Sequence, residues 1–138
     1  MNTPFLLNSL DAFRHFSPQF NWNQEEVHVA ALNAASAPIA TKLMFRGTVD
    51  FCLFHPRDIF RFVIQSNASS FIMAHNHPSG DPTPSKPDIA MTKKLKQAAN
   101  LLQIEFIDHL ILTPYSYVSF KELGLMGHGR KRTHANGF

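Results

Sequence analysis

The sequence contains one cysteine, Cys52, among its 138 residues. A single thiol excludes an intramolecular disulfide framework and any zinc finger built on several cysteines. We interpret Cys52 as a small buried hydrophobic residue. The chain also lacks an apolar run near the roughly 20 residues needed to span a bilayer, and its first residues lack the cationic segment and cleavage site of a signal peptide. We therefore expect a cytoplasmic protein in a reducing compartment, with no membrane partner.

The chain also has only a small excess of charge of one sign. The formal net charge is +3 with the eight histidines taken as neutral, and three consecutive basic residues lie in the final segment, GHGRKRTHANGF. A terminal basic segment is most simply a solvated tail. We predict a disordered basic tail over 127–138, with a weak contact to DNA as the alternative.

Hydrophobic periodicity predicts one α/β domain with a mixed β-sheet flanked by helices. Alternating or continuously apolar segments predict strands at 25–32, 39–51, 70–77, 104–113 and 115–120. Helical spacing predicts an N-terminal helix before Pro18, a second helix entered through His55-Pro56, and a third over 86–103. We expect three parts: an N-terminal helical extension (1–21), the domain (22–126) and the tail.

Each predicted helix has an apolar face that we expect to be buried. In the first helix this face contains Leu6, Leu7, Leu10 and Phe13. In the second it contains Ile59, Phe60, Phe62 and Val63. In the third it contains Ile89, Leu95, Ala98, Ala99 and Leu102.

The stretch AHNHPSGDPTPSKPD, residues 74–88, is the strongest candidate for a functional site. His75 and His77 lie two residues apart at the end of a predicted strand, so both side chains point to one face, as two imidazoles sharing a metal ion require. Four of the nine prolines stiffen the loop that follows. Ser85 and Asp88 have the spacing of a helix capping pair, which does not exclude a chemical role.

Three other interpretations of this stretch fail. The string His75-Asn76-His77 spells the name of a nuclease family, but the residues of that nuclease motif are dispersed instead of consecutive. An H-E-x-x-H helix is missing. The H-x-E and P-C-x-x-C pattern of nucleic-acid deaminases is excluded because the chain has one cysteine.

The pattern H-x-H, seven residues, S-x-x-D is the JAMM motif of JAB/MPN metalloproteases, present as His75, His77, Ser85 and Asp88. With DHLIL (108–112) and YVSF downstream, it resembles the RadC-like branch of that family over residues 22–126. The resemblance implies a JAB/MPN (cytidine-deaminase-like) architecture. It also implies a zinc ion held by His75, His77 and Asp88 with water in the fourth position, and Ser85 assisting at the oxyanion.

The resemblance further implies a glutamate as general acid/base on an early strand. Glu25 and Glu26 both begin the strand at 25–32, and only one can face inward. The family pattern places the glutamate eight residues before a position that is usually Asp and is Asn33 here, which selects Glu25. We interpret Asp108 and His109 as structural or hydrogen-bonding partners of the site instead of a fourth ligand. The N-terminal helix-hairpin-helix region of longer relatives has no room in this chain.

Three functions remain in competition. The first is a JAMM-type zinc peptidase or isopeptidase with an unidentified protein or peptide substrate. The second is an accessory of DNA repair or mobile elements acting on or near DNA, as the family's association with repair implies. The third is a non-catalytic MPN-like scaffold, which is least favoured because the ligand set is intact.

Overall fold

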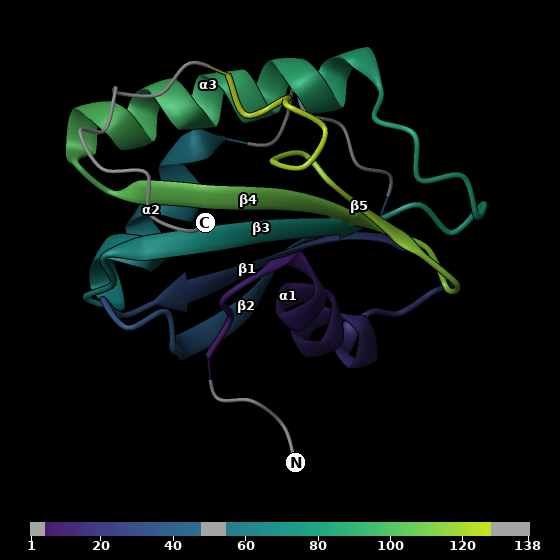
Figure 1. Ribbon diagram of the computed structural model, residues 1–138, viewed down its shortest axis with the longest axis horizontal. Coiled ribbons are helices and arrows are strands. Elements are labelled where there is room, and N and C mark those ends of the chain that lie inside the picture. The colour runs from purple at the N-terminus through teal and green to yellow at the C-terminus, as the bar shows by residue number, and fades with distance from the viewer. Residues whose placement is uncertain (1–4, 48–54, 128–138) are drawn as a thin grey trace.

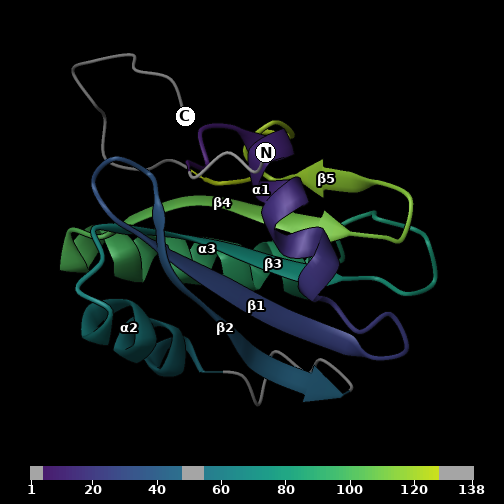
Figure 2. The same cartoon turned by 90° about the horizontal axis from the view of Figure 1, so that it is seen from below.

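The computed structural model describes residues 5–47 and 55–127. Cys52 and all of the predicted basic tail after Gly127 lie outside the described residues. The chain forms a mixed five-stranded sheet with helices on both faces (Figures 1 and 2). Among the described residues, no helix is both long enough and apolar enough to cross a membrane.

The sheet has the order β2-β1-β3-β4-β5. Its strands are β1 (Glu25–Leu32), β2 (Pro38–Gly47), β3 (Ser70–Asn76), β4 (Glu105–Leu112) and β5 (Tyr117–Ser119). β1 and β2 form an antiparallel hairpin, β1 also pairs antiparallel with β3, and β5 pairs antiparallel with β4. β3 and β4 are parallel, so the chain crosses over between them through a helix. The mixed α/β sheet predicted from the sequence is therefore confirmed.

Each helix begins at a capping residue or at a proline. They are α1 (Ser9–Phe16), α2 (Pro56–Gln65) and α3 (Lys86–Leu102), with a 3-10 turn over Ser17–Gln19. Asn8 caps α1 through its side chain, and α2 and α3 both have proline in their first turn. α2 and α3 cover one face of the sheet and α1 covers the other (Figures 1 and 2).

Two hydrophobic cores lie on the two faces of the sheet. Alternation along β3 divides its side chains between them: Phe71 and Met73 pack with α2 and α3, whereas Ile72 and Ala74 pack with α1. α1 contributes Ala12 and Phe16 to the second core. Side chains of the predicted N-terminal extension therefore pack on the sheet, and the division into three parts stays a prediction.

The predicted apolar faces were wrong at three leucines. Leu7 and Leu10 are exposed, because α1 starts at Ser9 and buries the face of Ser9, Ala12 and Phe16. Leu102 is also exposed, because α3 ends there and Gln103 adopts a left-handed conformation that turns the chain away. Periodicity places an apolar face correctly only when the start of the helix is known.

Candidate metal centre

Three side chains converge at the carboxyl end of β3. His75 Nε2 lies 3.0 Å from His77 Nε2 and 3.3 Å from a carboxylate oxygen of Asp88, and His77 Nε2 lies 3.6 Å from the other oxygen. One ligand atom from each residue lies within 4.8 Å of the others. Two imidazole nitrogens and a carboxylate in this arrangement could hold one metal ion.

The two histidines reach this point because alternation on β3 turns both rings to the face covered by α3. The main chain of His77 still pairs with β4, through its N–H to Leu112 O at 2.8 Å. Its ring is oriented by the proline-rich loop, since Nδ1 lies 2.9 Å from the carbonyl oxygen of Asp81. A carbonyl only accepts, so His77 Nδ1 carries a proton, and in the neutral ring the lone pair that a metal could bind is therefore on Nε2.

Asp88 is placed by the start of α3. Ser85 is the N-cap, its Oγ accepts the Asp88 N–H at 3.1 Å, and the Asp88 carboxylate accepts the Ser85 N–H at 2.8 Å. The predicted capping pair is thus a reciprocal capping box. It holds the carboxylate of Asp88 against the histidines, and Asp88 as a whole is only 2 % exposed. Ser85 accepts in this bond, so its own hydroxyl proton remains available to donate.

The electrostatics of the cluster favour an ionised carboxylate. Burial by itself raises the pKa of Asp88, but the hydrogen bonds that His75 and His77 donate when their Nε2 atoms are protonated outweigh it and hold that pKa far below the usual carboxyl range. The hydrogen bond to Asp88 raises the pKa of His77 against the opposing effect of burial, and the charge of Glu25 adds to the rise. The cluster therefore attracts a positive charge, whether a proton or a metal ion.

Glu25 and Glu26 lie on opposite faces of the sheet. Val27 and Val29 pack against α2 and α3, so Glu25 shares their face with the histidines. β1 pairs with β3 so that Val27 lies opposite His75, and two residues further this antiparallel register brings Glu25 alongside His77. The structure thus places Glu25, and not Glu26, on the sheet face of the candidate ligands.

Glu26 is fully buried in a separate polar network on the other face. Its carboxylate accepts hydrogen bonds from Asn21 N at 2.9 Å and Arg46 Nε at 2.7 Å, and contacts His28 Nε2 at 3.0 Å. Burial raises the pKa of Glu26, but these three partners together lower it below its usual value. Glu26 is therefore an ion-paired structural residue. His28, for which the sequence predicts no role, is one of its partners.

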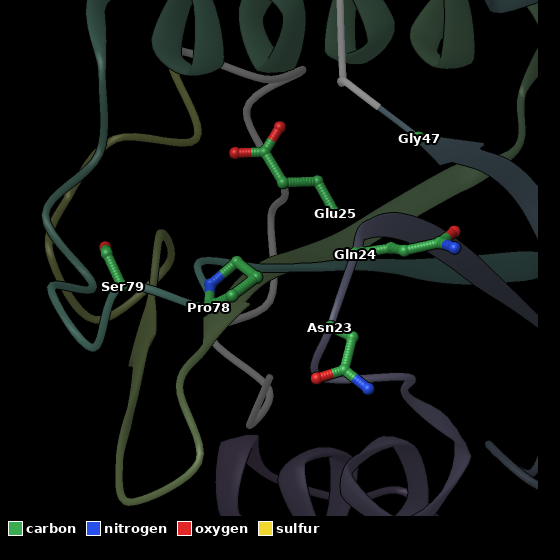
Figure 3. Close-up of a pocket in the computed structure, with 6 residues that line it drawn as sticks. All are labelled: Asn23, Gln24, Glu25, Gly47, Pro78 and Ser79. Carbon is green, nitrogen blue, oxygen red and sulfur yellow. The ribbon is translucent and has the colours of Figure 1, made fainter.

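A pocket of about 540 Å³ adjoins the cluster and is lined by Asn23, Gln24, Glu25, Gly47, Pro78 and Ser79. Figure 3 shows the Glu25 side chain extending between the loop that carries Pro78 and Ser79 and the end of β2 at Gly47. Its lining combines amide, carboxylate and hydroxyl groups with one proline. A polar substrate group could enter here beside Glu25.

His109 contacts the cluster from β4 without being placed as a ligand. Its Nε2 lies 2.7 Å from His75 Nδ1, the ring atom that points away from the other candidate ligands. The neighbouring Asp108 is fully buried and accepts hydrogen bonds from Ser119 Oγ and from the N–H groups of His109 and Lys121. Burial raises the pKa of the Asp108 carboxyl. The interpretation of these two residues as hydrogen-bonding partners agrees with this geometry.

The sequence is similar to proteins that carry the same domain. A family model described as RadC-like JAB domain matches residues 6–125. A UPF0758 protein of Clostridium beijerinckii is 42 % identical over 104 residues, covering 75 % of this chain and 45 % of the relative. A UPF0758 protein of Thermotoga maritima is 41 % identical over 117 residues, covering 85 % and 53 %. One of Clostridium botulinum is 44 % identical over 101 residues, covering 73 % and 44 %.

A mixed sheet with an H-x-H strand end facing a capped helix defines a small α/β domain of the JAB type. The chain belongs to the RadC-like JAB domain family. It spans about half the length of the curated relatives it matches.

Sequence analysis missed two residues that organise the site. No role is predicted for Asn76 from the sequence, yet its buried amide bonds Gln24 and Glu26 on either side of Glu25. None is predicted for Thr92, although it follows Asp88 by four residues and so lies one helical turn along the same face. That spacing, and a polar residue inside an otherwise apolar strand, were the available signals.

Proposed function

We propose that this chain is a zinc-dependent hydrolase of the JAMM type that cleaves a peptide or isopeptide bond. The observation that carries the proposal is the convergence of His75, His77 and Asp88 on the face that also presents Glu25. Imidazole and carboxylate ligands suit zinc. Three protein ligands leave a coordination position open, which is the arrangement of catalytic zinc sites.

The roles proposed for the side chains follow from their positions. A zinc ion held there would act as a Lewis acid and lower the pKa of the attacking water. Glu25 takes the proton from that water and delivers it to the amine nitrogen as the C–N bond breaks, while the hydroxyl stays on the acyl carbon. Ser85 donates its hydroxyl proton to the oxygen that gains negative charge. The pocket beside Glu25 receives the substrate.

The metal is tested first. We expect about one zinc per chain in the purified protein by native mass spectrometry after incubation with zinc, and a loss of zinc in His77→Ala and Asp88→Ala. An Asp58→Ala variant is the control, since the Asp58 carboxylate is 45 % exposed on α2 and takes no part in the ligand cluster. Wild-type protein that stays metal-free, or variants that keep their zinc, would sink the metal proposal.

Hydrolysis is tested with zinc-loaded protein on peptide and isopeptide libraries, including ubiquitin-like conjugates. Glu25→Gln should keep the zinc and lose activity by roughly 100-fold or more, because general acid/base catalysis contributes about that much. Glu105→Gln makes the same chemical change at the other end of the sheet, where Glu105 pairs with Ser70, and should leave activity intact. Equal rates for the two variants would remove Glu25 from the proposal.

The two alternatives have separate tests. A DNA accessory role rests on the basic tail, which lies outside the described residues, and predicts DNA binding that weakens steeply with salt. Absence of binding at low salt would exclude it. A non-catalytic scaffold predicts no hydrolysis by zinc-loaded protein together with a stable protein partner. Cytoplasmic location also stays a prediction.

A further inference from the structure

A buried chain of hydrogen bonds runs from the backbone of α3 to one candidate ligand. Thr92 Oγ1 lies 2.9 Å from the carbonyl oxygen of Asp88 and 2.6 Å from His109 Nδ1. His109 Nε2 lies 2.7 Å from His75 Nδ1. Thr92 and His109 have no solvent exposure and His75 is 2 % exposed, so water does not compete for these groups. This series of hydrogen bonds thus starts at the main-chain carbonyl of Asp88 and ends at the ring of His75.

The direction of every proton in this chain follows from its first acceptor. A carbonyl oxygen cannot donate, so the single hydroxyl proton of Thr92 goes to Asp88 O. Thr92 Oγ1 must then accept from His109 Nδ1–H. In the neutral imidazole of His109 the other nitrogen, Nε2, is therefore an acceptor, and the proton between the two rings belongs to His75 Nδ1. In the neutral ring of His75 the lone pair is therefore on Nε2.

We propose that Thr92 and His109 are positioning residues that set the tautomer and ring orientation of His75, and so direct its Nε2 lone pair at the metal. This inference rests on the proposed metal site. The opposite order, with a proton on His109 Nε2, would leave His75 protonated at Nε2 and unable to bind. The hydrogen bond from Thr92 to the helix carbonyl excludes that order.

The surroundings of His109 prevent its ring from turning over. Its ring stacks on Phe120 with centroids 4.2 Å apart and planes 25° apart. Asp108 accepts the Lys121 N–H at 3.0 Å, and the Phe120 N–H donates to His109 O at 2.9 Å, so the segment that carries Phe120 is tied to β4. The two candidate histidine ligands are thus oriented differently. His77 relies on a loop carbonyl, whereas His75 relies on a buried chain through three elements.

The first test uses two substitutions of Thr92. Thr92→Val preserves shape but has no hydroxyl, so His109 loses its acceptor. Zinc affinity, measured by competition with a chromophoric chelator, should fall roughly 10- to 100-fold, as is usual when an outer hydrogen-bonding partner is removed. Thr92→Ser keeps the hydroxyl and should bind zinc within a few-fold of wild type. A Val variant with wild-type affinity would overturn the proposal.

The second test needs no substitution. Long-range ¹⁵N–¹H spectra of histidine-labelled protein report which ring nitrogen carries the proton. They are recorded at pH 8 on the metal-free protein and then with zinc. We expect His109 to carry its proton on Nδ1 and His75 on Nδ1 in both states, with His75 Nε2 shifted when zinc is added. A proton on His109 Nε2 would contradict the inference regardless of metal binding.

These results separate the inference from the proposed hydrolase. Zinc-loaded protein with the expected tautomers but no hydrolysis of any substrate would leave the positioning role standing and remove the enzyme. Hydrolysis by the wild-type protein, together with normal zinc affinity in Thr92→Val, would support the hydrolase and remove the positioning role. His109→Gln adds a rescue: a Gln side chain can donate to Thr92 and accept from His75, so it should bind zinc more tightly than His109→Phe.

Discussion

Asn76 separates the two candidate histidine ligands, and alternation turns its side chain away from them. It is fully buried, and its amide makes three hydrogen bonds to the segment that leads into β1. Oδ1 accepts from Glu26 N at 2.7 Å, and Nδ2 donates to Gln24 O at 2.8 Å and to Asn21 O at 3.3 Å. Since Glu25 lies between the bonded positions 24 and 26, Asn76 holds it beside the candidate ligands.

Replacing Asn76 by Asp tests this role. The carboxylate keeps the acceptor for Glu26 N but faces two carbonyl oxygens without protons to donate, so one or both carbonyls are left unpaired. We expect a loss of roughly 1–3 kcal/mol in the free energy of unfolding, measured by urea denaturation at pH 7.5. Zinc stoichiometry should stay as in wild type, because the ligands lie on the other face. Unchanged stability would mean that other contacts hold this segment.

The raised pKa of His77 predicts how metal binding depends on pH. A proton and a metal ion compete for the same Nε2 atom. Because the pKa lies above the ordinary 6.5, competition begins at a higher pH than for an unperturbed histidine. Zinc affinity should fall about tenfold per pH unit below that pKa, for one proton displaced. Titrations with zinc between pH 5.5 and 8.5, conditions chosen to bracket the transition, would measure this.

A variant can assign that transition. The negative charge of Glu25 contributes to the raised pKa of His77, so Glu25→Gln should move the affinity profile to lower pH. Glu105→Gln, at the opposite end of the sheet, should leave it in place. If neither substitution moves the profile, the proton that competes with zinc belongs to another group.

At the scale of elements, the start of α3 combines two functions. The capping box between Ser85 and Asp88 ends the proline-rich loop and begins the helix, while the same Asp88 carboxylate faces both histidines. The carboxylate has two oxygens, and Oδ2 accepts from Ser85 N. The same residue therefore starts the helix and acts as a candidate ligand, so the orientation of α3 decides where the Asp88 carboxylate lies.

Two substitutions of Ser85 separate capping from chemistry. Ser85→Ala removes the cap and should cost about 1 kcal/mol of unfolding free energy, whereas Ser85→Gly at an N-cap costs only a few tenths. Both remove the hydroxyl. If that hydroxyl supports the reaction, both variants should lose activity to a similar extent despite their different stabilities, as thermal unfolding and hydrolysis assays would report. Activity that follows stability instead would restrict Ser85 to capping.

At the scale of the whole molecule, the candidate ligands His75, His77 and Asp88 lie on the sheet face that α3 covers, beside an apolar core that does not depend on them. The core facing α2 and α3 and the core facing α1 are both closed by apolar side chains. Among the described residues, every buried side-chain polar atom has a hydrogen-bond partner. The fold is therefore expected to persist without a metal, unlike small domains that fold only around zinc.

Metal removal should accordingly lower stability without unfolding the protein. We expect chelator-treated protein to keep its circular dichroism spectrum and to melt at a lower temperature than zinc-loaded protein. Zinc at 100 times its dissociation constant would add about 2.7 kcal/mol. Asp88→Ala should show no zinc-dependent shift. Loss of the folded spectrum on chelation would show that the metal is part of the core.

Local patterns in the sequence were sufficient to predict features that depend on neighbouring residues alone, such as where a strand or a helix begins. β1 begins at Glu25 and ends at Leu32 as alternation predicts, α2 begins at the predicted Pro56 and α3 at the predicted Lys86, because pleat, cap and proline geometry act within a few residues. The ligand candidates His75, His77 and Asp88 follow the same logic, since one strand end and one helix start carry all three.

Only the tertiary structure decided which groups from distant segments face one another. Alternation states that Glu25 and Glu26 point apart, but the pairing of β1 with β3 decides that Glu25 is the one beside His77. The contact between Thr92 and His109, and that between His109 and His75, join three elements across the sheet. Such contacts depend on strand register and on how α3 packs, which are set by the burial of whole faces and not by any short stretch of sequence.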